Sequence, residues 1–140
     1  MSDPKRILET SVRVAVLGAT DQSHKAGFYV PDYLRSQGYE VLPVSPRLAG
    51  TELFGRKVLA TLAELDDIDL VDVFRRPETL PGHLAELIAA RPRAVWFQSG
   101  IRHDQVAEAL RAEGIQVVQD RCTLADHGAW GLGAPQRPTR

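Results

Sequence analysis

The sequence lacks the features that several protein classes require. It has 1 cysteine in 140 residues, so neither an internal disulfide nor a cysteine-based zinc site is expected. Its 17 Lys and Arg residues are balanced by 18 Asp and Glu residues, which argues against nucleic-acid binding. No run of about 18 apolar residues occurs, and residues 1–13 lack the apolar segment of a signal peptide, so no membrane attachment is predicted. We therefore expect a cytoplasmic protein.

Length and composition fit one globular domain. Hydrophobic residues make up 44% of the chain and charged residues 25%, which excludes a disordered or fibrous class. We expect the domain to span residues 1–133. Residues 134–140 contain two prolines and no apolar periodicity, so they are predicted to form a flexible C-terminal tail.

Short apolar strands alternate with amphipathic helices along most of the chain. Strands are predicted at residues 12–17, 39–44, 69–74, 94–97 and 115–118. Helices are predicted at residues 27–37, 81–90 and 104–113. Residues 53–59 and 61–65 are less regular and indicate a short strand and a short helix. The alternation predicts an α/β fold, namely a Rossmann-like, doubly wound parallel sheet of about five strands.

The turn after the first strand is small and polar. Gly18, Ala19 and Thr20 lead toward Lys25 and the helix that follows. A helix N-terminus offers free N–H groups and a partial positive charge, so together with Lys25 it favours a bound phosphate. The alternative is an ordinary turn in which Thr20 or Ser23 caps the helix. The spacing matches neither the G-x-G-x-x-G fingerprint nor the G-x-x-x-x-G-K-[ST] loop.

The end of the second strand distinguishes between nucleotides. NAD-binding domains usually carry an acidic residue there that binds the ribose hydroxyl, whereas this chain has Ser45, Pro46 and Arg47. An arginine at this place favours a nucleotide with an extra ribose phosphate, either NADP or coenzyme A (CoA). The alternative is a solvated arginine in a tight turn.

The third and fourth strands end in further candidate residues. Adjacent side chains of an extended segment point to opposite sides, so one of Arg75 and Arg76 is expected to face the ligand. The Phe74 side chain is expected either to pack against an adenine ring or to lie in the hydrophobic core, and the core is the favoured interpretation. After the fourth strand, small residues would let a ligand approach the backbone closely. That segment is Gln98, Ser99, Gly100 and Ile101.

Taken together, these segments resemble the small stand-alone CoA-binding domain family. The resemblance is carried by residues 14–19, 43–47, 71–77, 95–101 and 120–122. Members are similar to the nucleotide-binding N-terminal domain of the succinyl-CoA ligase alpha subunit, without the domain that supplies its phosphohistidine. The family usually has Asn at the position of Ser45, and often Ser near the position of Thr20.

The resemblance implies a role for each candidate residue. The pyrophosphate would be bordered by Gly18, Ala19, Thr20 and Lys25. The phosphorylated ribose would be held by Ser45, Pro46 and Arg47, and the adenosine bordered by Phe74 and Arg75. The pantetheine would be bordered by Gln98, Ser99, Gly100 and Ile101.

No catalytic residue or metal site is predicted. Cys122 follows the fifth strand, and the resemblance suggests a mixed disulfide with the CoA thiol; a small buried residue is the favoured alternative. Asp120, Cys122, Asp126 and His127 match no common metal-site spacing, and His127 is expected to be solvated. His24 and His103 are expected in loops on the ligand side without an orienting carboxylate and a nucleophile, and His83 is expected on an exposed helix.

The leading hypothesis is a non-catalytic module that binds CoA or an acyl-CoA. It would act as a carrier, a sensor or a subunit whose catalytic partner is a separate chain. The alternatives are an NADP-dependent oxidoreductase domain that needs a further domain or a dimer partner, and an interaction domain that has lost its ligand. A partner protein and a homo-oligomer both stay open.

Overall fold

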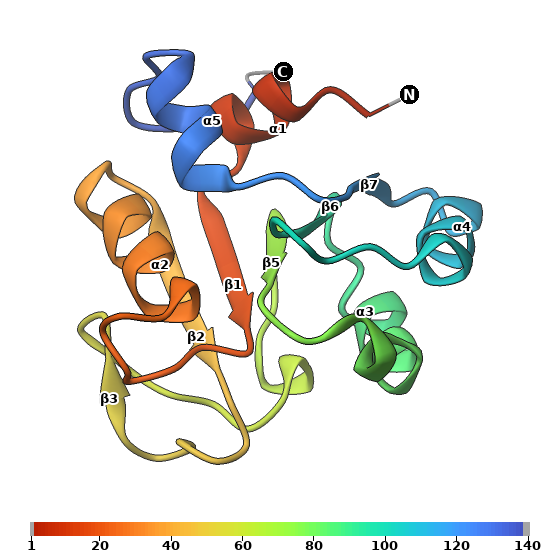
Figure 1. Ribbon diagram of the computed structural model, residues 1–140, viewed down its shortest axis with the longest axis horizontal. Helices are drawn as coiled ribbons and strands as arrows, with labels where there is room; N and C mark the ends of the chain where they lie inside the picture. Colours follow the sequence, from red (N-terminus) through yellow and green to blue (C-terminus); the bar gives the residue numbers. More distant parts are fainter. Residues whose placement is uncertain (1, 139–140) are drawn as a thin grey trace.

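The computed structural model describes residues 2–138 and is built around a five-stranded parallel sheet (Figure 1). Its strands are β1 (Arg13–Leu17), β2 (Glu40–Val44), β5 (Leu70–Val73), β6 (Ala94–Phe97) and β7 (Gln116–Val118). The α-helices are α1 (Pro4–Thr10), α2 (Ala26–Ser36), α3 (Leu84–Ala90), α4 (Asp104–Ala112) and α5 (Thr123–Ala129). A hairpin of β3 (Glu52–Leu53) and β4 (Arg56–Lys57) and the 3₁₀-helices η1 (Leu62–Glu64) and η2 (Pro77–His83) complete the fold.

The strand order identifies the doubly wound architecture. The order is β2-β1-β5-β6-β7, with each neighbouring pair parallel. Beyond β2, Leu59 forms one parallel bridge with Val44, where a longer third strand would lie in a Rossmann sheet. The order reverses between β1 and β5, which opens a crevice beyond their carboxyl ends. The predicted Rossmann-like fold is confirmed.

Helices cover both faces of the sheet, which explains why its strands are apolar at successive positions. Along β1, Val14 and Val16 pack with α1, α2 and α5, whereas Ala15 and Leu17 pack with α3 and α4. Figure 1 shows α3 and α4 on the opposite side of the sheet from α2 and α5. A strand buried on both faces needs apolar side chains in both directions, which accounts for the short continuous runs in the sequence.

Four segments differ from the prediction. The expected helix over residues 81–90 is an α-helix only from Leu84, because Pro77 and Pro81 lie in a 3₁₀ segment that precedes it. The sequence did not predict α1, although Asp3 caps it by accepting a hydrogen bond from Arg6 N. It also did not predict α5. The irregular stretch at residues 53–59 forms parts of a hairpin instead of one short strand.

The described part of the predicted tail contacts the domain. Gln136 N donates to Glu9 O at 2.9 Å, and Arg137 Nε donates to Asp69 Oδ2 at 3.0 Å. Asp69 also accepts hydrogen bonds from Val12 N and Arg13 N. Burial alone would raise the pKa of Asp69, but these hydrogen bonds and the charge of Arg137 hold it below its usual value. The flexibility of residues 134–140 stays a prediction.

No helix within residues 2–138 has both the length and the apolar character needed to cross a bilayer.

Candidate functional site

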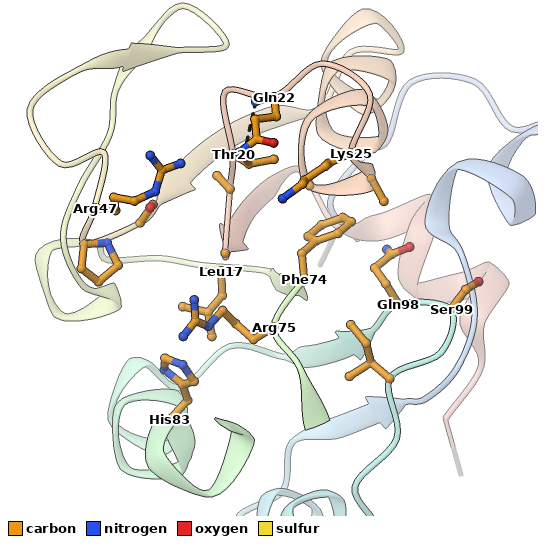
Figure 2. Close-up of a pocket in the computed structure, with 17 residues that line it drawn as sticks. Leu17, Thr20, Gln22, Lys25, Arg47, Phe74, Arg75, His83, Gln98 and Ser99 are labelled. Atoms are coloured by element: carbon orange, nitrogen blue, oxygen red, sulfur yellow. Dashed lines mark hydrogen bonds between the residues drawn. The ribbon is translucent and has the colours of Figure 1, made fainter. Parts of the chain in front are cut away.

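A pocket of about 650 Å³ opens at the carboxyl ends of β1, β2, β5 and β6 (Figure 2). Every predicted site residue except Gly100 lines it: Gly18, Ala19, Thr20, Lys25, Ser45, Pro46, Arg47, Phe74, Arg75, Gln98, Ser99 and Ile101. Residues from four separate segments of the chain meet here because parallel strands end at the same edge of the sheet. The volume lies in the usual range for small-molecule sites.

Gly100 lies outside the pocket lining because it turns the chain after β6. Its φ of 82° belongs to the left-handed region that favours glycine. Its N–H donates to Asp120 Oδ1 at 2.7 Å, so this amide is already used within the protein. Contact between Gly100 and a ligand stays a prediction.

The turn after β1 is fixed by backbone contacts. Gly18 N and Ala19 N both donate to Val44 O, at 3.1 and 3.3 Å, so these two amides serve the sheet and not a ligand. Gly18 has a φ of 92°, and a Cβ there would lie 2.9 Å from Phe74 O. A Cβ on Gly27 would lie 2.9 Å from Gly18 O. Gly27 thus lets the start of α2 approach the end of β1, and Gly18 lets the segment after β5 approach it.

The N-terminus of α2 faces the pocket without a side-chain cap. The expectation that Thr20 or Ser23 caps this helix is wrong: Lys25 occupies the N-cap position, and Thr20 Oγ1 instead accepts from Gln22 N at 3.2 Å. Within residues 2–138, the N–H groups of Ala26 and Gly27 have no hydrogen-bond acceptor. Both residues line the pocket, so they supply the open donors there.

Three positively charged side chains converge on the pocket. Figure 2 shows Lys25, at the start of α2, and Arg75, in the segment after β5, reaching over the pocket, with Arg47 at one edge. Arg47 Nη2 lies 3.6 Å from Asp21 Oδ1, and both side chains are largely exposed. Across residues 2–138, Lys25 and Arg75 have no carboxylate within 4.0 Å. The pocket therefore carries uncompensated positive charge and suits an anion.

Gln98 lines the side of the pocket away from Arg47, and its side-chain amide forms hydrogen bonds within the protein. Its Nε2 donates to Asp72 Oδ1 and, at 2.8 Å, to Thr123 Oγ1. Thr123 Oγ1 in turn donates to Asp72 Oδ2 at 3.0 Å. Asp72 is completely buried, and this burial raises its pKa to about 7. The network ties the loop after β6 to β5 and to the start of α5.

Comparison with known proteins agrees with this geometry. The sequence profile of a family described as "CoA binding domain" matches residues 12–128. The chain belongs to the CoA-binding domain family. This confirms the resemblance that the strand ends carry.

Relatives of this CoA-binding domain include one curated sequence and several solved structures. It is 35% identical over 124 residues to "Uncharacterized protein YneT" of Bacillus subtilis (strain 168), covering 88% of this chain and 90% of the relative. "The structure of cell-free ID.343 from Thermus thermophilus" matches with a TM-score of 0.88 and 45% identity, over 91% of this chain and 98% of that one. A "hypothetical protein from Pyrococcus horikoshii OT3" matches with a TM-score of 0.84 and 27% identity, over 91% and 89%.

The sequence missed several pocket residues of this CoA-binding domain. They are Leu17, Gln22, Ala26, Gly27 and His83. His83 was expected on an exposed helix, but it lies at the end of η2, where its ring lines the pocket and its Nδ1 lies 2.6 Å from Glu86 Oε1. The two neighbouring arginines differ, because Arg75 lines the pocket and Arg76 does not.

The residues near the C-terminus of the domain serve packing. His127 was expected to be solvated, but it is 1% exposed, with Nδ1 2.8 Å from Tyr33 Oη and Nε2 3.1 Å from Gly133 O. Cys122 is partly buried against the apolar cluster between the sheet and helices α1, α2 and α5, and it does not line the pocket. In the described range 2–138, acidic, His and Cys side chains form no cluster of three that could hold a metal ion.

Proposed function

We propose that this domain binds CoA or an acyl-CoA in the pocket and performs no catalysis itself. One observation carries the proposal: Lys25, Arg47 and Arg75 meet the open amides of α2 in a single pocket. Phosphate groups favour such a combination, because charge-assisted hydrogen bonds to several donors replace their hydration. The family membership supplies the identity of the phosphate-bearing ligand.

The arrangement supports a definite orientation of the ligand. The pyrophosphate would lie between Lys25 and the amides of Ala26 and Gly27, where the helix dipole adds positive potential. The phosphorylated ribose would lie by Arg47, and Arg75 would border the adenosine. The pantetheine would pass Ser99 and Ile101, on the side where Figure 2 shows Gln98.

A ribose phosphate, not a free ribose, suits the end of β2. Ser45, Pro46 and Arg47 line the pocket there and offer no carboxylate to a ribose hydroxyl pair. This favours CoA over NAD. The guanidinium of Arg47 matches a phosphate in charge and in its planar set of donors.

The pocket supports a non-catalytic role. Its hydroxyl groups come from Thr20, Ser45 and Ser99, and within residues 2–138 none of them is hydrogen-bonded to a histidine that could act as a base. We therefore infer a carrier, a sensor or a subunit that works with a separate catalytic chain in the cytoplasm.

Isothermal titration calorimetry with CoA, acetyl-CoA, NADP and NAD tests the proposal. We expect CoA and acetyl-CoA to bind more tightly than NADP, and NAD to bind most weakly. Arg75→Ala should weaken CoA binding, whereas the matched control Arg76→Ala, on an exposed neighbour outside the pocket, should not. A preference for NADP would favour an oxidoreductase domain, and no binding of any of the four would favour an interaction domain.

A further inference from the structure

His83 is a pocket residue to which the proposed function assigns no role so far. It is the last residue of η2 and the N-cap of α3, and its side chain is 19% exposed. His83 and Arg75 line the same pocket, and Figure 2 draws the His83 ring on the side of Arg47 and away from Ser99. The imidazole thus belongs to the basic half of the pocket.

The orientation of this imidazole is set by Glu86. Nδ1 of His83 lies 2.6 Å from Glu86 Oε1, and Glu86 Oε2 accepts a hydrogen bond from Leu62 N at 3.2 Å. The carboxylate is therefore held from η1 as well as from α3. A carboxylate accepts only, so Nδ1 carries the proton, and Nε2 is the nitrogen left for a ligand.

We propose that His83 contacts the ribose phosphate of CoA through Nε2, together with Arg47 and Arg75, and that Glu86 positions its ring. This inference rests on the proposed CoA-binding function. A phosphate monoester carries close to two negative charges and three acceptor oxygens, so it can use a third donor beside two arginines. When the phosphate binds, a proton that Nε2 takes up from solvent would form that donor, while Nδ1 keeps its hydrogen bond to Glu86.

The position of His83 favours the ribose phosphate over the pyrophosphate. The pyrophosphate donors are Lys25 and the amides at the start of α2, and Figure 2 shows Lys25 on the far side of Arg75 from His83. The charged groups that face His83 are Glu86 from α3 and Arg75 from the segment after β5. His83 is therefore placed to contact the ribose phosphate, the second anionic group of CoA.

Calorimetry with CoA and dephospho-CoA, which differ only in the ribose phosphate, tests the inference. We expect His83→Ala, which leaves no side-chain donor, to weaken CoA binding about fivefold to tenfold and to change dephospho-CoA binding less than about twofold. The matched control is His24→Ala, because His24 is an exposed histidine outside the pocket lining, and this variant should bind both ligands like the wild type. Thermal unfolding of each variant verifies that it is folded.

The outcomes separate this inference from the function on which it rests. If the wild type binds CoA and His83→Ala binds it equally well, or loses both ligands equally, His83 does not contact the ribose phosphate. If the wild type binds neither ligand, the CoA-binding function itself is wrong. For Glu86, long-range ¹H–¹⁵N spectra report the His83 tautomer. Glu86→Ala removes the acceptor of Nδ1–H and should move part of the proton from Nδ1 to Nε2, and an unchanged tautomer would exclude the positioning role.

Discussion

Asp72 is a carboxyl group buried in the sheet, and its ionisation should make the stability of the protein depend on pH. It has no exposed surface and accepts hydrogen bonds from Gln98 and Thr123. Among residues 2–138, no basic side chain forms an ion pair with it. Burial raises its pKa from 3.8 to about 7, because two hydrogen bonds do not replace the lost hydration of a carboxylate.

The sign and the size of the effect follow from this pKa. The folded state binds more protons than the unfolded state between the two pKa values, so stability from the neutral carboxyl is present below pH 3.8 and is lost as the pH rises through about 7. A difference of about three pKa units corresponds to about 4 kcal/mol in total. Between pH 5 and pH 8, the loss amounts to about 2–3 kcal/mol.

Asp72→Asn removes the titration and keeps the shape of the side chain. We expect the free energy of unfolding of the variant, relative to the wild type, to rise by about 2–3 kcal/mol between pH 5 and pH 8. Urea unfolding followed by circular dichroism at both pH values measures this difference, and other titrating groups cancel. Asp66→Asn serves as the control, because the Asp66 side chain is 99% exposed. A difference that stays constant with pH would refute the argument that Asp72 is neutral in the folded protein at pH 5.

Three further predictions concern other parts of the domain. Arg47→Ala should weaken CoA binding about tenfold more than dephospho-CoA binding by calorimetry, and equal losses would remove Arg47 from the ribose phosphate. Asp69→Asn should lower the free energy of unfolding by about 2 kcal/mol at pH 7. Because the pKa of Asp69 is lowered in the folded protein, the difference between wild type and variant should shrink as the pH falls below the usual range of aspartate, and urea unfolding measures this difference. Gly27→Ala should cost about 1–3 kcal/mol because its Cβ meets Gly18 O, whereas Gly82→Ala, with open space around it, should be tolerated in thermal unfolding.

The sheet could be predicted from the sequence because its strands are buried on both faces. Residues 94–97 form β6 as predicted, and the other four main strands begin or end within one residue of the prediction. The short helices could not be predicted in the same way. Both α1 and α5 have 7 residues, as does α3, which lies within a predicted helix. Unlike α3, they do not connect two strands of the sheet, and helices this short form because they pack on it.

The pocket could be predicted to the extent that it depends on where strands end. That rule brought Arg47, Arg75 and Ser99 to one place. His83 was missed by this rule because it lies at the end of η2, ten residues after the end of β5, and not at a strand end. The hydrogen bonds of Asp72 could not be predicted either, since Thr123 lies 51 positions away and no local sequence pattern joins the two residues.

The two halves of the pocket are held in place by different forces. The basic half depends on close backbone contact, in which Gly27 lets α2 approach β1 and Gly18 lets the segment after β5 approach β1, and such contact does not change with pH. The half near Gln98 depends on the buried carboxyl of Asp72, which does titrate. Ionisation of Asp72 should therefore affect the loop after β6 and α5 before it affects the phosphate-binding turn. CoA would span both halves of the pocket. It would contact one half whose backbone is held by pH-independent packing, and another half whose loop is held by hydrogen bonds to the protonated carboxyl of Asp72.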